Sequence, residues 1–228
     1  MLVIQSKPLR KTIKTAVPFI IVPVLAIAGG LTFTEKRHII ISLAIAFYAL
    51  LLFAAGFEKK TTGSRRLVIA SVMIALCFAG RAIPFIKPVT ALTIISGIYV
   101  GSETGFLVGA MSAVLSNFYC GQGPWTAFQM LAWGLIGFAS GILSDPLRKN
   151  TAFRLIFGAL SGIGYSFIMD IWTVLWYGNG FDIHLYLAAL VTAIPYTVSY
   201  AVSNVLFLLL LFKPFGEKLQ RIKIKYGV

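Results

Sequence analysis

Apolar segments of about 20 residues recur along the whole chain, and they restrict the folds open to it. A helix needs about 20 apolar residues to cross a hydrocarbon core of roughly 30 Å. Irregular backbone cannot lie exposed to lipid, because its N–H and C=O groups would have no partners there. We therefore predict an all-α, polytopic membrane protein whose apolar segments are residues 12–33, 38–57, 67–84, 89–118, 125–143, 153–177 and 184–212.

The charge of the chain fits a membrane protein better than a protein that binds nucleic acid. Only 12% of the 228 residues are charged and 58% are hydrophobic, which leaves too little polar surface for a water-soluble globule. The net charge of +13 would suggest nucleic acid in a soluble protein, but the basic residues lie between and beyond the apolar segments. We interpret them as topology signals, with the lipid bilayer and not a nucleic acid as the partner.

Residues 89–118 decide the topology, because they can form one span or two spans joined by a turn at residues 101–105. Lysine and arginine accumulate in short cytoplasmic loops. Eight spans with an internal N-terminus place 16 of the 20 basic residues in the cytoplasm, whereas seven spans place only 8 there. The sixteen are Lys7, Arg10, Lys11, Lys14, Lys59, Lys60, Arg65, Arg66, Arg148, Lys149, Arg154, Lys213, Lys218, Arg221, Lys223 and Lys225. We therefore predict two spans, both termini in the cytoplasm, and Glu103 at a cytoplasmic turn between Gly101 and Gly105.

This split leaves residues 89–100 too short to cross the membrane alone, since a dozen residues make roughly 18 Å of helix. The preceding residues 85–88 must then dip into the protein. Irregular backbone at membrane depth is tolerated only against protein or a water-filled cavity. We therefore predict a cavity that opens to the outside.

Two charged residues within the spans, Arg81 and Asp170, are the first candidates for this cavity. Both are predicted in the outer half of the membrane, where ionisable side chains usually pair with one another or face a cavity. The residues alone leave three interpretations open: a salt bridge between Arg81 and Asp170, contact of either with a ligand, and extension of Arg81 to the membrane interface.

Polar and aromatic residues gather in the outer connections, whereas the inner connections are plain basic loops. The loop NFYCGQGPWTAF, residues 117–128, displays rings and an amide on a bent backbone and can line a ligand pocket. An ordinary outer turn and the aromatic belt of membrane proteins explain many of the same residues. With Arg81 and Asp170, the predicted substrate-binding residues are Phe85, Lys87, Tyr119, Gln122, Trp125, Trp176, Tyr177, Asn179 and His184.

The sequence lacks the motifs of ATP hydrolysis and of hydrolytic catalysis: GxxxxGK[ST], HExxH and GxSxG. The cysteines and histidines have no metal-site spacing. We therefore predict no enzymatic activity and no cofactor of the chain's own. The function classes that remain are the binding subunit of a primary importer, a stand-alone secondary transporter and, third, a membrane enzyme or scaffold that would use Asp182 and His184.

From Leu67 onward the chain resembles the S-components of energy-coupling factor (ECF) transporters, which bind vitamins for import into bacteria and archaea. Four features carry the resemblance in this order: Ala75 and Ala79 as an AxxxA motif, RAIPFIKP at residues 81–88, GIYVGSETG at 97–105 and YCGQGPW at 119–125. Among S-components, the sequence looks most like those specific for cobalamin.

The resemblance implies a six-helix core, residues 67–228, preceded by an extension of two transmembrane helices, residues 1–66. It implies that Ala75 and Ala79 contact a transmembrane coupling subunit and that two cytoplasmic ATPases use ATP to drive transport. The implied function is high-affinity binding of a vitamin at the bacterial plasma membrane, with release by reorientation against the coupling subunit. Cobalamin (vitamin B12) is the expected ligand, with His184 or Cys120 as candidate cobalt ligands; riboflavin, folate, pantothenate and a queuosine precursor are alternatives.

Overall fold

The computed structural model describes residue 4 and residues 6–31, 37–56, 60–84, 86–178 and 180–227, and within these residues it contains helices and no strands. The prediction of an all-α membrane protein is confirmed. The elements are α1 (Lys7–Ala16), the π-helical segment η1 (Val17–Ile21), α2 (Val22–Leu31), α3 (Arg37–Ala55), α4 (Lys60–Gly80), α5 (Val89–Val100), α6 (Ser102–Cys120), α7 (Trp125–Ile142), α8 (Ser144–Lys149), α9 (Thr151–Tyr177), α10 (Ile183–Thr192) and α11 (Ile194–Tyr226).

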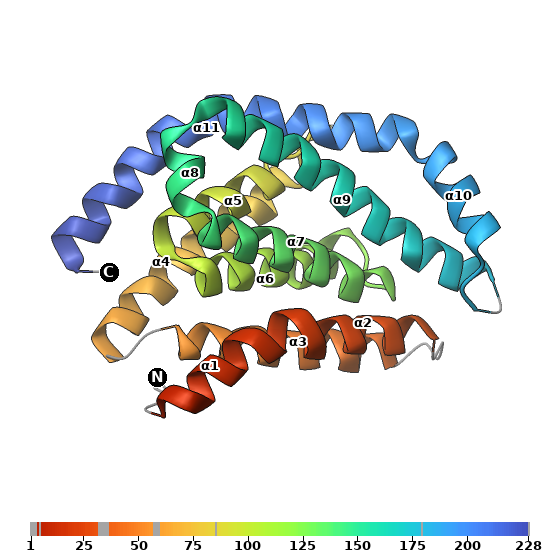
Figure 1. Cartoon of the computed structure of the whole chain (residues 1–228), viewed down its shortest axis with the longest axis horizontal. Helices are drawn as coiled ribbons and strands as arrows, with labels where there is room; N and C mark the ends of the chain where they lie inside the picture. The colour runs from red at the N-terminus through yellow and green to blue at the C-terminus, as the bar shows by residue number, and fades with distance from the viewer. Residues whose placement is uncertain are drawn as a thin grey trace.

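Four of the described helical stretches are both long and apolar enough to cross a membrane: Lys7–Leu31, Gly63–Gly80, Thr151–Tyr177 and Ile194–Tyr226. The helices α3, α6 and α7, with 19, 19 and 18 residues, each extend about 27 Å or more. Both ends of the chain lie at the same end of the helical bundle, and the connection between α9 and α10 lies at the opposite end (Figure 1). This arrangement agrees with an even number of crossings.

The chain reverses between α5 and α6, as the distribution of basic residues predicts. The helix breaks at Gly101, whose φ of 115° lies in a region that favours glycine. The helices α5 and α6 then pack side by side. A Cβ atom built on Gly105 would lie only 2.7 Å from the Cα atom of Gly97, so the absence of side chains lets the two helices touch.

The connection between α4 and α5 packs against α11, although several of its residues, including Ile83 and Lys87, are exposed. In Figure 1 it lies well inside the end of the bundle that α9 and α10 form. The Ser203 hydroxyl on α11 holds it there, because Oγ accepts a hydrogen bond from the Lys87 N–H (2.9 Å) and donates one to the Lys87 carbonyl (3.0 Å). Ser203 is buried. Phe85, in the same connection, lies outside the described residues.

The stretch predicted as one span, residues 184–212, is not one continuous helix. The helix ends at Thr192, and a new one begins at Ile194 and continues to Tyr226. Pro195 stands in the first turn of α11 and has no N–H group to continue the hydrogen bonds of α10. With 33 residues, or roughly 50 Å, α11 is longer than the hydrocarbon core is thick, so its basic end extends beyond the core on the side predicted to be cytoplasmic.

The N-terminal helices cover one face of the remaining bundle. The α2 helix packs on α7, and α3 packs on α6 and α7. The π-helical segment between α1 and α2 begins at Val17-Pro18, where proline removes one backbone donor. The extension is therefore part of one helical body with the rest of the chain.

Candidate functional site

A cavity lies between α5, α7, α9, α11 and the connection after α4, in the half of the bundle predicted to face outward. Its volume is about 80 Å³. Its lining combines cations, rings and amides: Arg81, Lys87, Val89, Thr90, Gln129, Trp133, Tyr165, Tyr200, Ser203 and Asn204. Arg81 and Lys87 are the two residues of the sequence prediction that line this cavity.

Three rings form one wall of the cavity. The Trp133 and Tyr165 rings stack, with centroids 5.0 Å apart and planes at 18°, and Tyr200 meets Tyr165 edge-on at 5.2 Å. The Trp133 Nε1 group donates to Thr90 Oγ1 at 3.2 Å, which fixes the indole between α5 and α7. The two rings stack on each other and Arg81 lies near the Trp133 ring, so a flat aromatic ligand would contact the part of the wall that these contacts leave open.

Arg81 anchors a polar network beside this wall. Its guanidinium donates to Ser116 Oγ and Asn117 Oδ1, both at 2.7 Å, and its Cζ atom lies 5.4 Å from the Trp133 ring centroid. The Asn117 amide in turn donates to Thr126 Oγ1 and Gln129 Oε1, both at 2.8 Å. The network holds Arg81 in place without a carboxylate.

The salt bridge between Arg81 and Asp170 is therefore not formed, and that interpretation is wrong. Arg81 follows α4 and reaches the end of α6, where Ser116 and Asn117 are fully buried and need partners. Asp170 lies on α9 and is only 7% exposed. Its Oδ2 atom has no hydrogen-bond partner among the described residues.

Two other buried polar atoms lie near the outer end of the bundle without a described partner: Gln122 Nε2 and Trp172 Nε1. Gln122 accepts a hydrogen bond from Thr126 Oγ1 at 2.6 Å, but its amide nitrogen is unused. Trp172 packs edge-on against Trp125, with ring centroids 5.6 Å apart, and lies at 5.9 Å from Trp176. A ligand that reached Gln122 or Trp172 would find a donor that is already desolvated.

The other predicted site residues lie away from the cavity lining. Tyr119, Tyr177 and His184 are exposed at the outer end of the bundle, and Asn179, like Phe85, lies outside the described residues. The Asp182 carboxylate caps α10: it accepts hydrogen bonds from the N–H groups of His184 (2.7 Å) and Leu185 (3.1 Å). These two hydrogen bonds lower the pKa of Asp182 below its ordinary value.

The comparison with known protein families identifies the chain. Residues 62–221 match the family described as "ECF-type riboflavin transporter, S component". The chain belongs to the ECF S-components. No curated protein and no solved structure gives a significant match. Membership makes this chain a multi-pass membrane subunit of a vitamin transporter, which works with a membrane coupling unit and ATPases, and not a member of an enzyme family.

Most residues that line the cavity of this S-component escaped the sequence prediction. Thr90, Gln129, Trp133, Tyr165 and Tyr200 lie within apolar helices and look like ordinary span residues. A signal was present for one of them, because Gln129 is a polar residue inside an apolar stretch, and such residues usually face a cavity or a polar partner.

The AxxxA motif of this S-component lies on the surface of α4, where Ala75 and Ala79 are exposed. Apolar grooves flank this helix. One, of about 360 Å³, runs between α3, α4 and α6 and includes Ala75, Leu107 and Met111 in its lining; the other, of about 570 Å³, lies between α4 and α11. Contact of Ala75 and Ala79 with the coupling unit remains a prediction.

Proposed function

We propose that this S-component binds riboflavin in the outer cavity and delivers it to the cytoplasm of a bacterial cell by reorientation against the coupling unit, while two ATPases supply the energy. The observation that carries the proposal is the stacked pair of Trp133 and Tyr165 beside the Arg81 network. Riboflavin joins a flat tricyclic ring to a hydroxyl-bearing chain. Trp133 and Tyr165 can contact the tricyclic ring. Arg81, Gln129 and Asn204 carry donors and acceptors for the hydroxyl groups of the chain. The description of the matched family supports the same ligand.

The cavity must widen before it admits a vitamin. Its volume of about 80 Å³ is below the roughly 300 to 1,000 Å³ of small-molecule pockets. Lys87 lies in the connection between α4 and α5, which is the part of the cavity lining that is not helical. Two hydrogen bonds between the Lys87 backbone and Ser203 hold this connection against α11. We infer that ligand entry separates Lys87 from Ser203, so the narrow cavity corresponds to a closed conformation.

Cobalamin is the second candidate, because the sequence as a whole looks most like the cobalamin-specific members. A corrin macrocycle is much larger than a flavin, so it needs a wider opening of the same cavity. The cobalt ligands considered for it, His184 and Cys120, are exposed and are not in the cavity lining. The geometry therefore favours the flavin.

Titration of the detergent-purified chain with riboflavin, without ATP, tests the proposal. Stacking against Trp133 and Tyr165 quenches flavin fluorescence, so we expect saturable quenching with sub-micromolar affinity. Tyr165→Leu is expected to weaken binding at least tenfold through loss of ring contact. The matched control, Tyr196→Leu, alters an exposed tyrosine on α11 and is expected to bind as the parent does.

Parallel titrations with cobalamin, folate and pantothenate separate the ligand from the function class. Binding of cobalamin but not of riboflavin would overturn the ligand and leave the S-component role intact. Uptake into vesicles is expected only when the coupling unit and ATPases are present. Uptake by the lone chain on an ion gradient would show a secondary transporter instead.

A further inference from the structure

A concave basic surface lies on α1, in the part of the chain that the family match does not cover. Lys7, Arg10, Lys11, Lys14 and Thr15 line it, and its volume is about 320 Å³. The four cations stand at positions i, i+3, i+4 and i+7, so a helix places them on one face. Ile13, on the other side of the helix, packs against the apolar core. We call these five lining residues the α1 basic surface.

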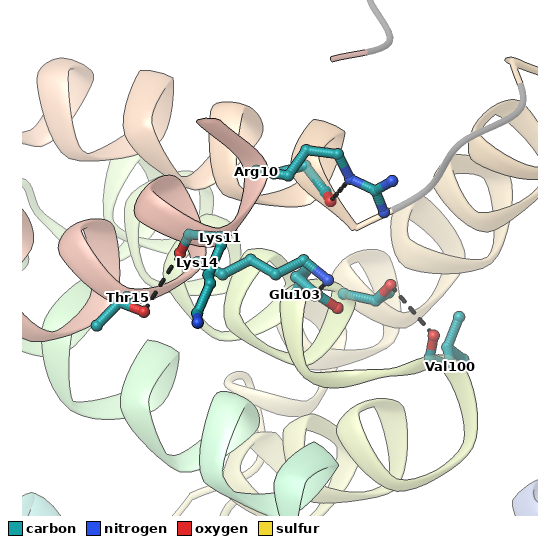
Figure 2. Close-up of polar contacts among 8 residues, drawn as sticks. Arg10, Lys11, Lys14, Thr15, Val100 and Glu103 are labelled. Atoms are coloured by element: carbon teal, nitrogen blue, oxygen red, sulfur yellow. Dashed lines mark hydrogen bonds and ion pairs between the residues drawn. The ribbon is translucent and has the colours of Figure 1, made fainter. Parts of the chain in front are cut away.

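Two contacts fix the α1 basic surface to the rest of the protein. Lys14 Nζ lies 2.5 Å from Glu103 Oε1, at the start of α6, and Arg10 Nε donates to the Ala55 carbonyl at the end of α3 (2.9 Å). Figure 2 shows the Lys14 side chain extended toward Glu103. Glu103 offsets the positive charge of Lys14. Lys7 and Lys11 are exposed, so the surface keeps a positive surplus.

The apolar stretch that follows α1 indicates that the α1 basic surface lies at the depth of the lipid headgroups, on the side predicted to be cytoplasmic. The helix continues without a break from α1 through η1 into α2, and the apolar stretch begins at Ala16-Val17. One turn beyond Thr15, Phe19 and Ile20 are 56% and 59% exposed, as expected of side chains that face acyl chains. Lys7 to Lys14 cover about 10 Å of helix immediately on the cytoplasmic side of this apolar band.

We propose that the α1 basic surface binds the headgroup phosphate of an anionic phospholipid in the inner leaflet. Basic pockets of transmembrane helices on the cytoplasmic side attract such headgroups, and each nearby lysine or arginine adds to the attraction. The exposed apolar band next to the surface accommodates the acyl chains, which a soluble phosphate lacks. The bound lipid would lie beside the contact between Lys14 and Glu103 that joins the N-terminal extension to the turn between α5 and α6.

Native mass spectrometry of the full chain in detergent tests the proposal, with phosphatidylglycerol and phosphatidylcholine of identical acyl chains as probes. We expect phosphatidylglycerol to bind more tightly. The double substitution Lys7→Gln and Lys11→Gln is expected to weaken the binding of phosphatidylglycerol about tenfold or more, because each lysine near an anionic headgroup contributes to the attraction. The control, Lys149→Gln with Lys213→Gln, removes the same charge from exposed cytoplasmic positions on α8 and α11 and is expected to change binding less than twofold.

Two further measurements separate a lipid headgroup from a soluble phosphate and from the vitamin. Millimolar inorganic phosphate is not expected to displace the lipid, and displacement would overturn the assignment in favour of a soluble phosphate. Equal binding of both lipids, or an equal loss in the control variant, would also overturn it. The vitamin cavity lies in the opposite half of the bundle, so the lysine variants are expected to keep full vitamin affinity; failure of either proposal is thus visible separately.

Discussion

Substitution of Gly105 by alanine is expected to destabilise the bundle and to loosen the cavity. A Cβ atom at this position would lie 2.7 Å from both the Gly97 Cα atom and the Gly137 carbonyl carbon, and closer still to the Gly137 carbonyl oxygen. All three are backbone atoms, so no side chain can rotate away. Ordinary contact begins at 3.4 Å, and α5 and α7 must therefore both retreat from α6.

The size of the effect follows from two opposing contributions. Overpacking costs about 1 to 3 kcal/mol, and the upper end applies here because whole helices must move. Alanine returns about 1 kcal/mol through its helix propensity. A net loss of about 2 kcal/mol lowers the Tm of a chain of this size by roughly 4 to 8 °C.

Thermal unfolding in detergent, followed by tryptophan fluorescence, measures this loss. Gly164→Ala on α9 is the matched control, because a Cβ atom there meets no atom within 4 Å. The control is expected to raise Tm by about 2 to 4 °C through helix propensity alone. Separation of α5 from α7 also strains the 3.2 Å hydrogen bond between Thr90 and Trp133, so Gly105→Ala is expected to weaken vitamin binding as well.

The reasoning would be refuted if Gly105→Ala and Gly164→Ala shifted Tm in the same direction by similar amounts. That result would mean that α5, α6 and α7 are not in contact through bare backbone. It would also remove the packing basis of the cavity wall that α5 and α7 form together.

Three further predictions concern the outer half of the protein. Ser203→Ala removes both hydrogen bonds to Lys87, so stopped-flow fluorescence is expected to show faster vitamin association and faster release; unchanged rates would show that Lys87 does not gate entry. Asp170→Leu replaces a buried carboxylate that has an unused oxygen, so Tm without vitamin is expected to rise by several degrees while the affinity falls; a lower Tm would show that Asp170 is structural. Because two backbone donors lower the pKa of Asp182, its cap stabilises α10 above pH of about 4 and is lost as pH falls through that lowered pKa. The protection factors of the first amides of α10, taken relative to intrinsic exchange at each pH, are therefore expected to fall only at acid pH, and Asp182→Asn, which caps without titrating, is expected to remove this dependence.

The crossings could be predicted from the sequence because they depend on properties that single residues carry. Basic residues report the side of the membrane, and glycine reports where the backbone can reverse. Together these place the turn at Gly101 and make α5 short, which in turn requires the connection before it to enter the protein. Each step uses chain length and local chemistry, with no knowledge of which helix packs on which.

The break before α11 could also have been predicted, since its signal is local. Residues 184–212 form one apolar stretch, and apolarity alone predicts one span. Pro195 cannot donate a backbone hydrogen bond and is favoured in the first turn of a helix, so it indicates a new start near residue 194. Hydropathy alone does not register this signal, because it ignores the missing N–H group of proline.

The cavity lining could not be predicted in the same way, because it depends on how helices rotate against one another. Trp133 and Tyr165 are 32 positions apart in sequence and stack only because α7 and α9 pack together. The outer loops drew the prediction toward Tyr119 and Tyr177, whose polarity is visible in the sequence. Both are exposed at the outer end, where an ordinary turn explains such residues without a ligand.

The unused polar atoms of Asp170, Gln122 and Trp172 connect packing to function. Each buried atom without a partner costs about 1 to 3 kcal/mol, and together they would weigh heavily on a protein of marginal stability. Apolar side chains at these positions would remove the cost without disturbing the helices. If a bound ligand supplied hydrogen bonds to these atoms, it would recover this cost on binding, and affinity would then depend on closure of the outer end. The sign of the stability change on Asp170→Leu therefore distinguishes a carboxylate kept for a ligand from one kept for the fold.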